Sequence, residues 1–400
     1  MIKTALQQLS INPNDAECQG IIDEAIYAHD VQEMLYPEPF RRSNPKNPTS
    51  LVGPIRLGLV NHSGIEWGIS PEMLTKMVVV LGRTGGGKTT VIKAIIRGLL
   101  KNRTASIIIP DRKQDFYDLP LDHGFLYLLL KDFRDNWCNP PEGVAPRLWY
   151  DVLAEILATS RELRIAAHDL LVDTLIELSK AVKANTNLPT LRDVSRRLFE
   201  ISKRAKGTKK EQATRLGYRI GSLLSIVGDA AASQQGIEWS KLSKFGWALS
   251  LAGLASSTQS LCITIYFAKC LLYRICNNLR SESLKTLIVL DEASMIFPKT
   301  GNKKSALLLD YFQQARAFGI GVIFASQSMN LADEIFANTA TKIAVGGFGH
   351  GGDYEAFASA VGLSRPQREF MRTISRPGAA VIKDLRFPHP FTVQIDRGNQ

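Results

Sequence analysis

The chain has 400 residues, enough for roughly two or three domains, and its 45% apolar and 22% charged residues are ordinary for a globular protein. No apolar run reaches about 18 residues and no basic stretch with an apolar core opens the sequence, so we expect no integral membrane segment, no signal peptide and a cytoplasmic protein. The net charge of +11 suits a polyanionic partner such as DNA, RNA or an anionic membrane face, although a solvated basic surface would also account for it.

The N-terminal part predicts one helix, a loop and a hairpin. Apolar residues spaced for one helical face run over Asp15–Met34. Residues 37–54 are rich in Pro, Ser and Asn and predict a linker or surface loop. Two short runs with strand character, Ile55–Val60 and Gly64–Ile69, then predict a hairpin that leads into the next strand.

A phosphate-binding loop follows the apolar run Met77–Leu81, which predicts a buried strand. Its pattern, G-x-x-x-x-G-K-[ST], occupies Gly82, Arg83, Thr84, Gly85, Gly86, Gly87, Lys88 and Thr89, with Thr90 directly after them. Glycines let backbone N–H groups curl around a triphosphate, and the helix that follows points its positive end at the same charge. Lys88 would reach the β- and γ-phosphates, and the Thr89 hydroxyl would bind Mg²⁺. The alternative, a glycine-rich turn without a ligand, explains neither the strand before the loop nor the amphipathic helix after it, so we expect nucleotide binding, with ATP and Mg²⁺ as cofactors.

The middle of the chain changes character. Thr104–Ile109 and Phe125–Leu130 predict further strands, but strand signals disappear between about Ala145 and Leu242. One predicted helix runs from Trp149 to about Ala184, and another opens at Thr190, which has capping-box spacing to Asp193. This stretch predicts an all-helical insertion.

Alternating strands and helices return after the insertion and predict an α/β fold with a parallel sheet. The expected strands are Trp247–Leu254, Leu284–Leu290, Gly321–Ala325, Thr341–Val345 and Ala379–Ile382. The expected helices are Gln259–Leu279, Lys304–Phe318 and Asp353–Val361. The resulting domains are an N-terminal helix and linker (1–50), a P-loop core (51–145 and 240–400) and a helical insertion (146–239).

Two carboxylates, Asp291 and Glu292, follow the apolar strand Leu287–Leu290. Ligands of open α/β sheets lie at the carboxyl ends of the strands. Asp291 would hold Mg²⁺ through its water shell, and Glu292 would orient and polarise the attacking water. A strand that simply ends in surface acids is the alternative. Together with the P-loop, the pair predicts hydrolysis of the nucleotide rather than binding alone.

A polar residue, Gln327, ends another buried strand, Gly321–Ala325. It could face the γ-phosphate and report hydrolysis to the rest of the protein. A lone glutamine at a strand end is a weak signal, but its place one helix after the Asp-Glu strand strengthens it.

These segments together resemble the HerA/FtsK superfamily of P-loop ATPases, which includes DNA-pumping translocases and type IV secretion coupling ATPases. The resemblance is strong in the P-loop, in Asp291-Glu292-Ala293 and in Ala325-Ser326-Gln327, and looser in residues 111–116, 338–346 and 375–380. It spans roughly 51–145 and 240–395. It implies a RecA-like, additional-strand P-loop NTPase with a mostly parallel sheet flanked by helices.

The resemblance also implies a ring, usually a homo-hexamer, with sites at subunit interfaces. Such a site needs a cation from the neighbouring subunit. Arg316 is the candidate, because it matches the arginine before the Gly-Ile start of the glutamine strand. A helix-end arginine paired with a carboxylate is the alternative, and Arg280, Arg365 and Arg372 are weaker candidates for the role.

The predicted insertion carries a basic cluster: Arg192, Arg196, Arg197, Lys203, Arg204, Lys206, Lys209, Lys210 and Arg215. Few aromatic residues lie among them, which fits sequence-independent contacts with phosphates. A solvated helix face or a surface for a partner protein fits equally well. By the family analogy alone, Lys303 and Lys304 could face the central channel of a ring.

Three functions remain open. The first is an ATP-driven ring motor that translocates on, or pumps, double-stranded DNA. The second is an ATPase of a secretion or conjugation apparatus, peripheral to a membrane complex. The third is a ring that scaffolds an effector such as a nuclease. The five cysteines form no Cys-x-x-Cys pair and the six histidines show no ligand spacing, so we expect reduced, mostly buried thiols and no transition-metal site.

Overall fold

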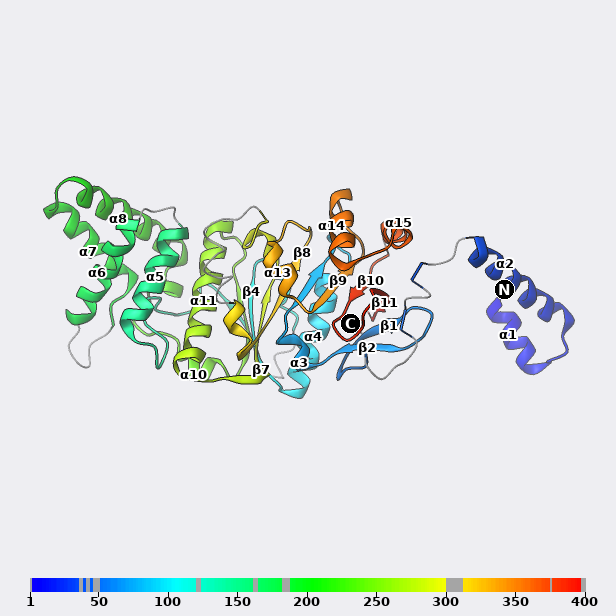
Figure 1. Ribbon diagram of the computed structural model, residues 1–400. Helices are drawn as coiled ribbons and strands as arrows, with labels where there is room; N and C mark the ends of the chain where they lie inside the picture. Colours follow the sequence, from blue (N-terminus) through cyan, green and yellow to red (C-terminus); the bar gives the residue numbers. More distant parts are fainter. Residues whose placement is uncertain are drawn as a thin grey trace.

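A computed structural model describes residues 2–35, 39–40, 44–45, 51–119, 124–160, 165–181, 188–299, 312–374 and 376–396. Their strands are β1 (Ile55–Val60), β2 (Glu66–Ile69), β3 (Val78–Leu81), β4 (Ser106–Asp111), β5 (Phe125–Leu129), β6 (Gly246–Ser250), β7 (Ser281–Leu290), β8 (Phe318–Ser326), β9 (Thr341–Val345), β10 (Ala379–Lys383) and β11 (Phe391–Ile395). They join in a single sheet of order β2-β1-β11-β10-β9-β3-β8-β7-β4-β6-β5 (Figure 1).

The sheet is parallel over most of its width. From β9 to β5 every pairing is parallel, whereas β10, β11, β1 and β2 extend the sheet with antiparallel pairings. The glutamine strand β8 lies between the P-loop strand β3 and the Asp-Glu strand β7. The predicted additional-strand α/β fold is therefore confirmed, and so is the hairpin of β1 and β2.

The central strands are covered on both faces, which explains their unbroken apolar sequences. Alternate side chains of β3 belong to different cores, because successive residues of a strand point to opposite faces. Val78 and Val80 pack with α4 (Lys88–Asn102), whereas Val79 and Leu81 face the core that contains α11 (Ser256–Cys276), α13 (Asp333–Asn338) and α14 (Gly351–Val361). α15 (Arg365–Thr373) packs beside α14.

Helices fill the stretch in which strand signals disappear. They are α5 (Pro146–Ser160), α6 (Ile165–Ala181), α7 (Leu191–Arg204), α8 (Gly207–Val227), α9 (Asp229–Ala232) and α10 (Trp239–Leu242), and most of them gather at one end of the molecule (Figure 1). Thr190 caps α7 with the predicted capping box to Asp193. The buried side chains of α5 to α8 are continuous with the core around α11, and the division at residues 146 and 239 stays a prediction.

The single helix expected from Trp149 to Ala184 is wrong. The chain forms α5 and α6, which pack against each other. One straight helix of that length would leave its apolar stripe without a partner, whereas the folded pair buries Leu153 and Leu157 together with Leu171 and Leu175.

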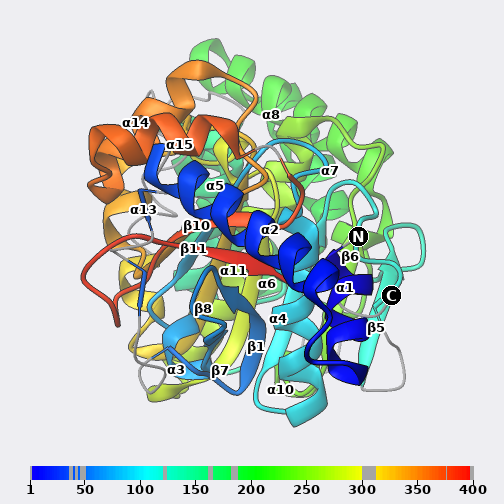
Figure 2. The ribbon, with the colours of Figure 1, turned by 90° about the vertical axis from the view of Figure 1, so that its right-hand side faces the viewer.

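The N-terminal region forms two helices rather than one, α1 (Ile2–Ile11) and α2 (Ala16–Leu35). They pack on each other and stand apart from the sheet, in front of its antiparallel end in Figure 2. Part of the predicted loop 37–54 is not a solvated linker. Phe40 is fully buried with its ring 6.0 Å from that of Phe370, and the Asn44 side chain donates to the Asn61 carbonyl and accepts from the Thr392 N–H.

Other boundaries also differ from expectation. Phe318 begins β8 instead of ending a helix, and residues 304–311 of that expected helix lie outside the described residues. The sequence pattern missed β11, α13 and α15, and also α3 (Pro71–Leu74). No helix in the described part of the chain has the length and apolar character needed to cross a membrane. All five cysteines are free, and four of them are buried.

Candidate nucleotide site

The P-loop lies at the carboxyl end of β3 and is held by its neighbours in the sheet. The N–H of Gly82 donates to Ser326 at the end of β8, and that of Arg83 donates to the Gly347 carbonyl after β9. Gly82 and Gly87 adopt φ values of 152° and 111°, which residues with a Cβ rarely do. The glycines thus let the loop turn tightly between two strands and start a helix.

The start of α4 offers backbone N–H groups and a lysine that could bind an anion. The first backbone N–H groups of a helix have no intrahelical partner, and the N-cap here is Gly87, which has no side chain to bond them. Lys88 is buried, and its Nζ donates to the carbonyls of Gly82 (2.7 Å) and Arg83 (3.2 Å). Burial lowers the pKa of Lys88, although the carboxylates of Asp291 and Glu292 act in the opposite direction. Thr89 and Thr90 are half-buried in the first turn, whereas Arg83, Thr84 and Gly85 are exposed.

The two carboxylates stand at the end of β7, two strands away from the P-loop. Asp291 is buried, and both burial and the neighbouring Glu292 raise its pKa. Glu292 has a left-handed backbone with φ of 56°, a costly conformation for a residue with a Cβ. Burial would raise the pKa of Glu292, but hydrogen bonds from Lys113 and Gln327 outweigh it, and the pKa lies below its ordinary value.

Gln327 lies between the P-loop and Glu292, as the strand order requires. Its Oε1 accepts from the Thr84 hydroxyl at 2.8 Å, and its Nε2 donates to Oε1 of Glu292. The structure therefore brings together the P-loop, Asp291, Glu292 and Gln327 from three strands.

These groups fit a nucleotide with Mg²⁺. The loop offers backbone donors and a buried lysine for phosphate, and Thr89 and Asp291 are the hard oxygen ligands that Mg²⁺ prefers. The described residues contain no group of three or more His, Cys, Asp or Glu side chains that could hold a metal ion. A Mg²⁺ ion here would therefore take its remaining ligands from phosphate and water.

Two segments, one after β4 and one after β9, contribute residues to the site that the sequence analysis did not assign to it. Lys113, after β4, donates to the Glu292 carboxylate, and Arg112 beside it donates to Gln259 and, at 3.5 Å, to the Glu292 carbonyl. Gly346, after β9, lies against the P-loop backbone: a Cβ placed there would come within 2.3 Å of the Gly86 Cα. The only available signals were the loose resemblance of residues 111–116 and the small residues after the strand at 341–345.

We expect Gly346→Ala to weaken ATP binding by about tenfold or more, since the new methyl group would displace Gly86 and alanine tolerates the φ of 67° poorly. Titration with a slowly hydrolysed ATP analogue measures the effect. Gly349→Ala is the matched control, because a Cβ at Gly349 meets nothing within 4 Å. Equal affinities of the two variants would contradict the packing argument.

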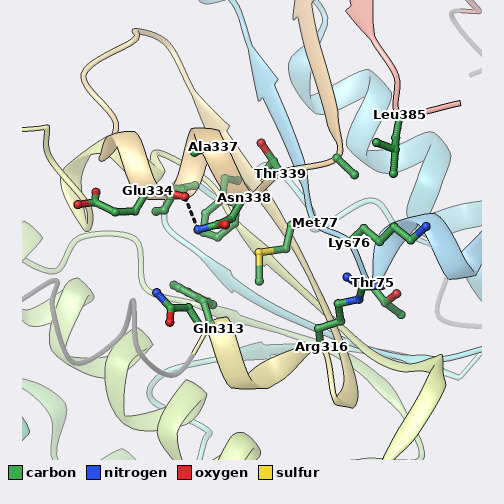
Figure 3. A pocket seen from close by; sticks show the side chains of 14 residues that line it. Thr75, Lys76, Met77, Gln313, Arg316, Glu334, Ala337, Asn338, Thr339 and Leu385 are labelled. Carbon is green, nitrogen blue, oxygen red and sulfur yellow. Dashed lines mark hydrogen bonds between the residues drawn. The ribbon is translucent and has the colours of Figure 1, made fainter. Parts of the chain in front are cut away.

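Arg316 is not part of this cluster. It precedes β8, whereas Gln327 follows that strand, so the two lie at opposite edges of the sheet. Arg316 lines a cavity of about 650 Å³ on the same side as Thr75 and Lys76, with Glu334 on the other side (Figure 3).

The Arg316 side chain is exposed and has no ion-pair partner within the described residues. The weaker candidates are engaged elsewhere, Arg365 with Glu369, Arg372 with Glu355, and Arg280 over the ring of Phe318. Three residues named from the family resemblance lie outside the described residues: Lys303, Lys304 and Ser375.

The structure divides the predicted basic cluster in two. Four of its arginines pair with carboxylates: Arg192 with Asp229, Arg196 with Asp193, Arg197 with Glu177 and Glu200, and Arg215 with Glu211. The other five cations are exposed around the turn from α7 to α8, without an ion-pair partner in the described chain. We call Lys203, Arg204, Lys206, Lys209 and Lys210 the basic corner.

Comparison with known proteins identifies the family and the fold. Residues 55–269 match the family model of the central domain of helicase HerA. The DNA double-strand break repair helicase HerA of Sulfurisphaera tokodaii is 24% identical over 307 residues, which cover 73% of this chain and 59% of that protein. The chain therefore spans less than two thirds of the length of this curated relative.

Solved structures share the fold. VirB4 of Thermoanaerobacter pseudethanolicus superposes with a TM-score of 0.65 at 16% identity, covering 88% of this chain and 97% of that one. The plasmid coupling protein TrwB in complex with ADP and Mg²⁺ superposes with a TM-score of 0.66 at 12% identity, covering 90% and 92%.

Proposed function

The chain belongs to the family of the HerA helicase central domain, and from that membership we propose that it is an ATPase whose hydrolysis drives movement on double-stranded DNA. The observation that carries the proposal is the convergence of Lys88, Asp291, Glu292 and Gln327 at one edge of the sheet. The ADP and Mg²⁺ held by the similarly folded TrwB support the choice of cofactors.

Each side chain takes the role that its chemistry suits. Lys88 and the N-terminal N–H groups of α4 would bind the phosphates, and Thr89 and Asp291 would hold Mg²⁺, which when bound would neutralise phosphate charge. The Glu292 carboxylate is linked to the loop through Gln327, and its pKa lies below the ordinary value, so it is the group that would accept a proton from the attacking water. Gln327 contacts both the loop and Glu292, a position from which it senses the phosphate.

A ring assembly completes the site. Arg316 lies too far from the P-loop of its own chain to act there, yet its guanidinium is exposed and unpaired among the described side chains. In a homo-hexamer it would reach the nucleotide of the next subunit and stabilise transition-state charge. The protein would work in the cytoplasm, alone or at the periphery of a membrane complex.

Double-stranded DNA should stimulate the ATPase, and the stimulation should fade as salt rises, because phosphate contacts release counterions. ATPase rates with and without DNA across a salt series measure it. Replacing the basic corner with alanine should lower the stimulation at low salt, whereas Arg196→Ala/Arg215→Ala, which removes charges already offset by carboxylates, should change it little.

The same assay separates the alternatives. Absence of any DNA effect at low salt would reject the DNA motor and favour a secretion ATPase or an effector scaffold. If DNA stimulates the variant without the basic corner as strongly as the unmodified protein, the DNA-motor proposal stands, but the basic corner is not its DNA contact.

A further inference from the structure

A chain of hydrogen bonds runs along the carboxyl edge of the sheet in strand order. Thr84 follows β3, Gln327 follows β8, Glu292 follows β7 and Lys113 follows β4, and these four strands are consecutive neighbours. Thr84 donates to Gln327, Gln327 donates to Glu292, and Lys113 donates to Glu292 from the other side. We call these four side chains the edge network.

Both donors to Glu292 use the same carboxylate oxygen. Nζ of Lys113 and Nε2 of Gln327 each bond to Oε1, and within the described residues Oε2 has no hydrogen-bond partner. Two donors from opposite sides fix the plane of the carboxylate. The second oxygen is then left for a water molecule.

Lys113 is itself held in place. The carboxylate of Asp111 accepts hydrogen bonds from the N–H groups of Lys113, Asp115 and Phe116, and from the Tyr127 hydroxyl. These bonds close a turn in which Gln114 has a left-handed φ of 62°. Asp111 is buried, so the turn presents Lys113 from a rigid base.

The charges around Glu292 also favour a role for Lys113. Asp291 lies next to Glu292 in the chain, and Asp115 lies near both Asp291 and Lys113. Lys88 is bonded to P-loop carbonyls and Arg112 to Gln259, so in the described structure Lys113 is the cation whose side chain bonds the Glu292 carboxylate. Without it, two neighbouring carboxylates would repel each other.

We propose that Lys113 is a positioning residue for ATP hydrolysis: together with Gln327 it fixes Oε1 of Glu292 and leaves Oε2 to the attacking water. The inference rests on the proposed ATPase activity. It assigns Lys113 no contact with the nucleotide, and this separates it from Lys88, whose loss should impair binding.

Lys113→Met keeps the aliphatic stem and removes the charge. We expect it to lower kcat by about tenfold to 100-fold while the Kd for a slowly hydrolysed ATP analogue changes by less than about threefold. Lys113→Arg should recover most of kcat, because guanidinium can donate to the same oxygen. Lys101→Met is the matched control on the exposed end of α4, and neither constant should change.

A double-variant cycle gives the decisive readout. If Lys113 and Gln327 act through one carboxylate, Lys113→Met combined with Gln327→Ala should lose much less than the product of the two single losses. Multiplicative losses, an unchanged kcat in Lys113→Met, or a loss of analogue affinity would each overturn the proposal. If the unmodified protein hydrolyses no ATP, the proposed function fails instead, and the two failures are thereby distinguished.

Discussion

Glu292→Gln should abolish ATP turnover while ATP still binds. Glutamine has nearly the same shape as glutamate, and its amide oxygen can still accept from Lys113 and Gln327, so the edge network keeps its geometry. The amide cannot take a proton from water, and loss of a general base typically costs about 10²–10⁴ in rate. Phosphate release measures turnover, and titration with ATP measures binding.

Two further variants serve as comparisons for Glu292→Gln. Lys88→Ala should weaken binding itself, because it removes the buried cation of the P-loop. Glu282→Gln makes the same chemical change at an exposed position near the start of β7 and should alter neither quantity. Turnover at the normal rate in Glu292→Gln would show that another group activates the water.

Much of the site could be predicted because its parts are local in sequence. The P-loop needs its glycines and lysine at fixed spacing. A buried parallel strand reads as an apolar run, and the polar residues Asp291 and Gln327 directly follow two such runs. The sequence also predicted the Thr190 cap correctly, since a capping box spans only three residues.

The contributions that were missed depend on strand order, which no local pattern encodes. Lys113 meets Glu292 because β4 lies beside β7, although the two residues are far apart in the chain. Gly346 meets Gly86 for the same reason, through the pairing of β9 with β3. Phe40 was assigned to a linker because the proline-rich composition around it hid one apolar side chain that packs on Phe370.

Arg316 and Gln327 lie at opposite ends of the same strand. Both residues flank β8, but only the carboxyl end of that strand meets the P-loop. The family resemblance assigned Gln327 to the chain's own site and Arg316 to the site of a neighbouring subunit. The structure places Arg316 at the opposite edge, where it can serve a nucleotide only if a second subunit brings one there.

Lys269→Met should be among the most destabilising single changes in the protein. Lys269 and Asp135 are 1% and 0% exposed, and their charged atoms lie 2.9 Å apart. Lys269 also donates to the Asn136 carbonyl and lies over the ring of Trp149. Removing the lysine alone leaves a buried carboxylate without its counter-charge, which costs about 3–5 kcal/mol in unfolding free energy.

The loss should extend beyond the ion pair, because Asp135 also joins distant parts of the chain. Asp135 precedes the helical segment, and its backbone bonds to the backbone of Asp229 and Ser233 near the end of that segment. Its carboxylate accepts from the Ile237 N–H and from Lys269 on α11. The backbone and the carboxylate of Asp135 together therefore join the start of the helical segment to its end and to α11. Asp135→Asn/Lys269→Met, which removes both charges, should recover much of the stability, because no lone charge remains buried. Urea unfolding of the single and double variants measures this, and a loss below about 1 kcal/mol in Lys269→Met would mean that water reaches the carboxylate.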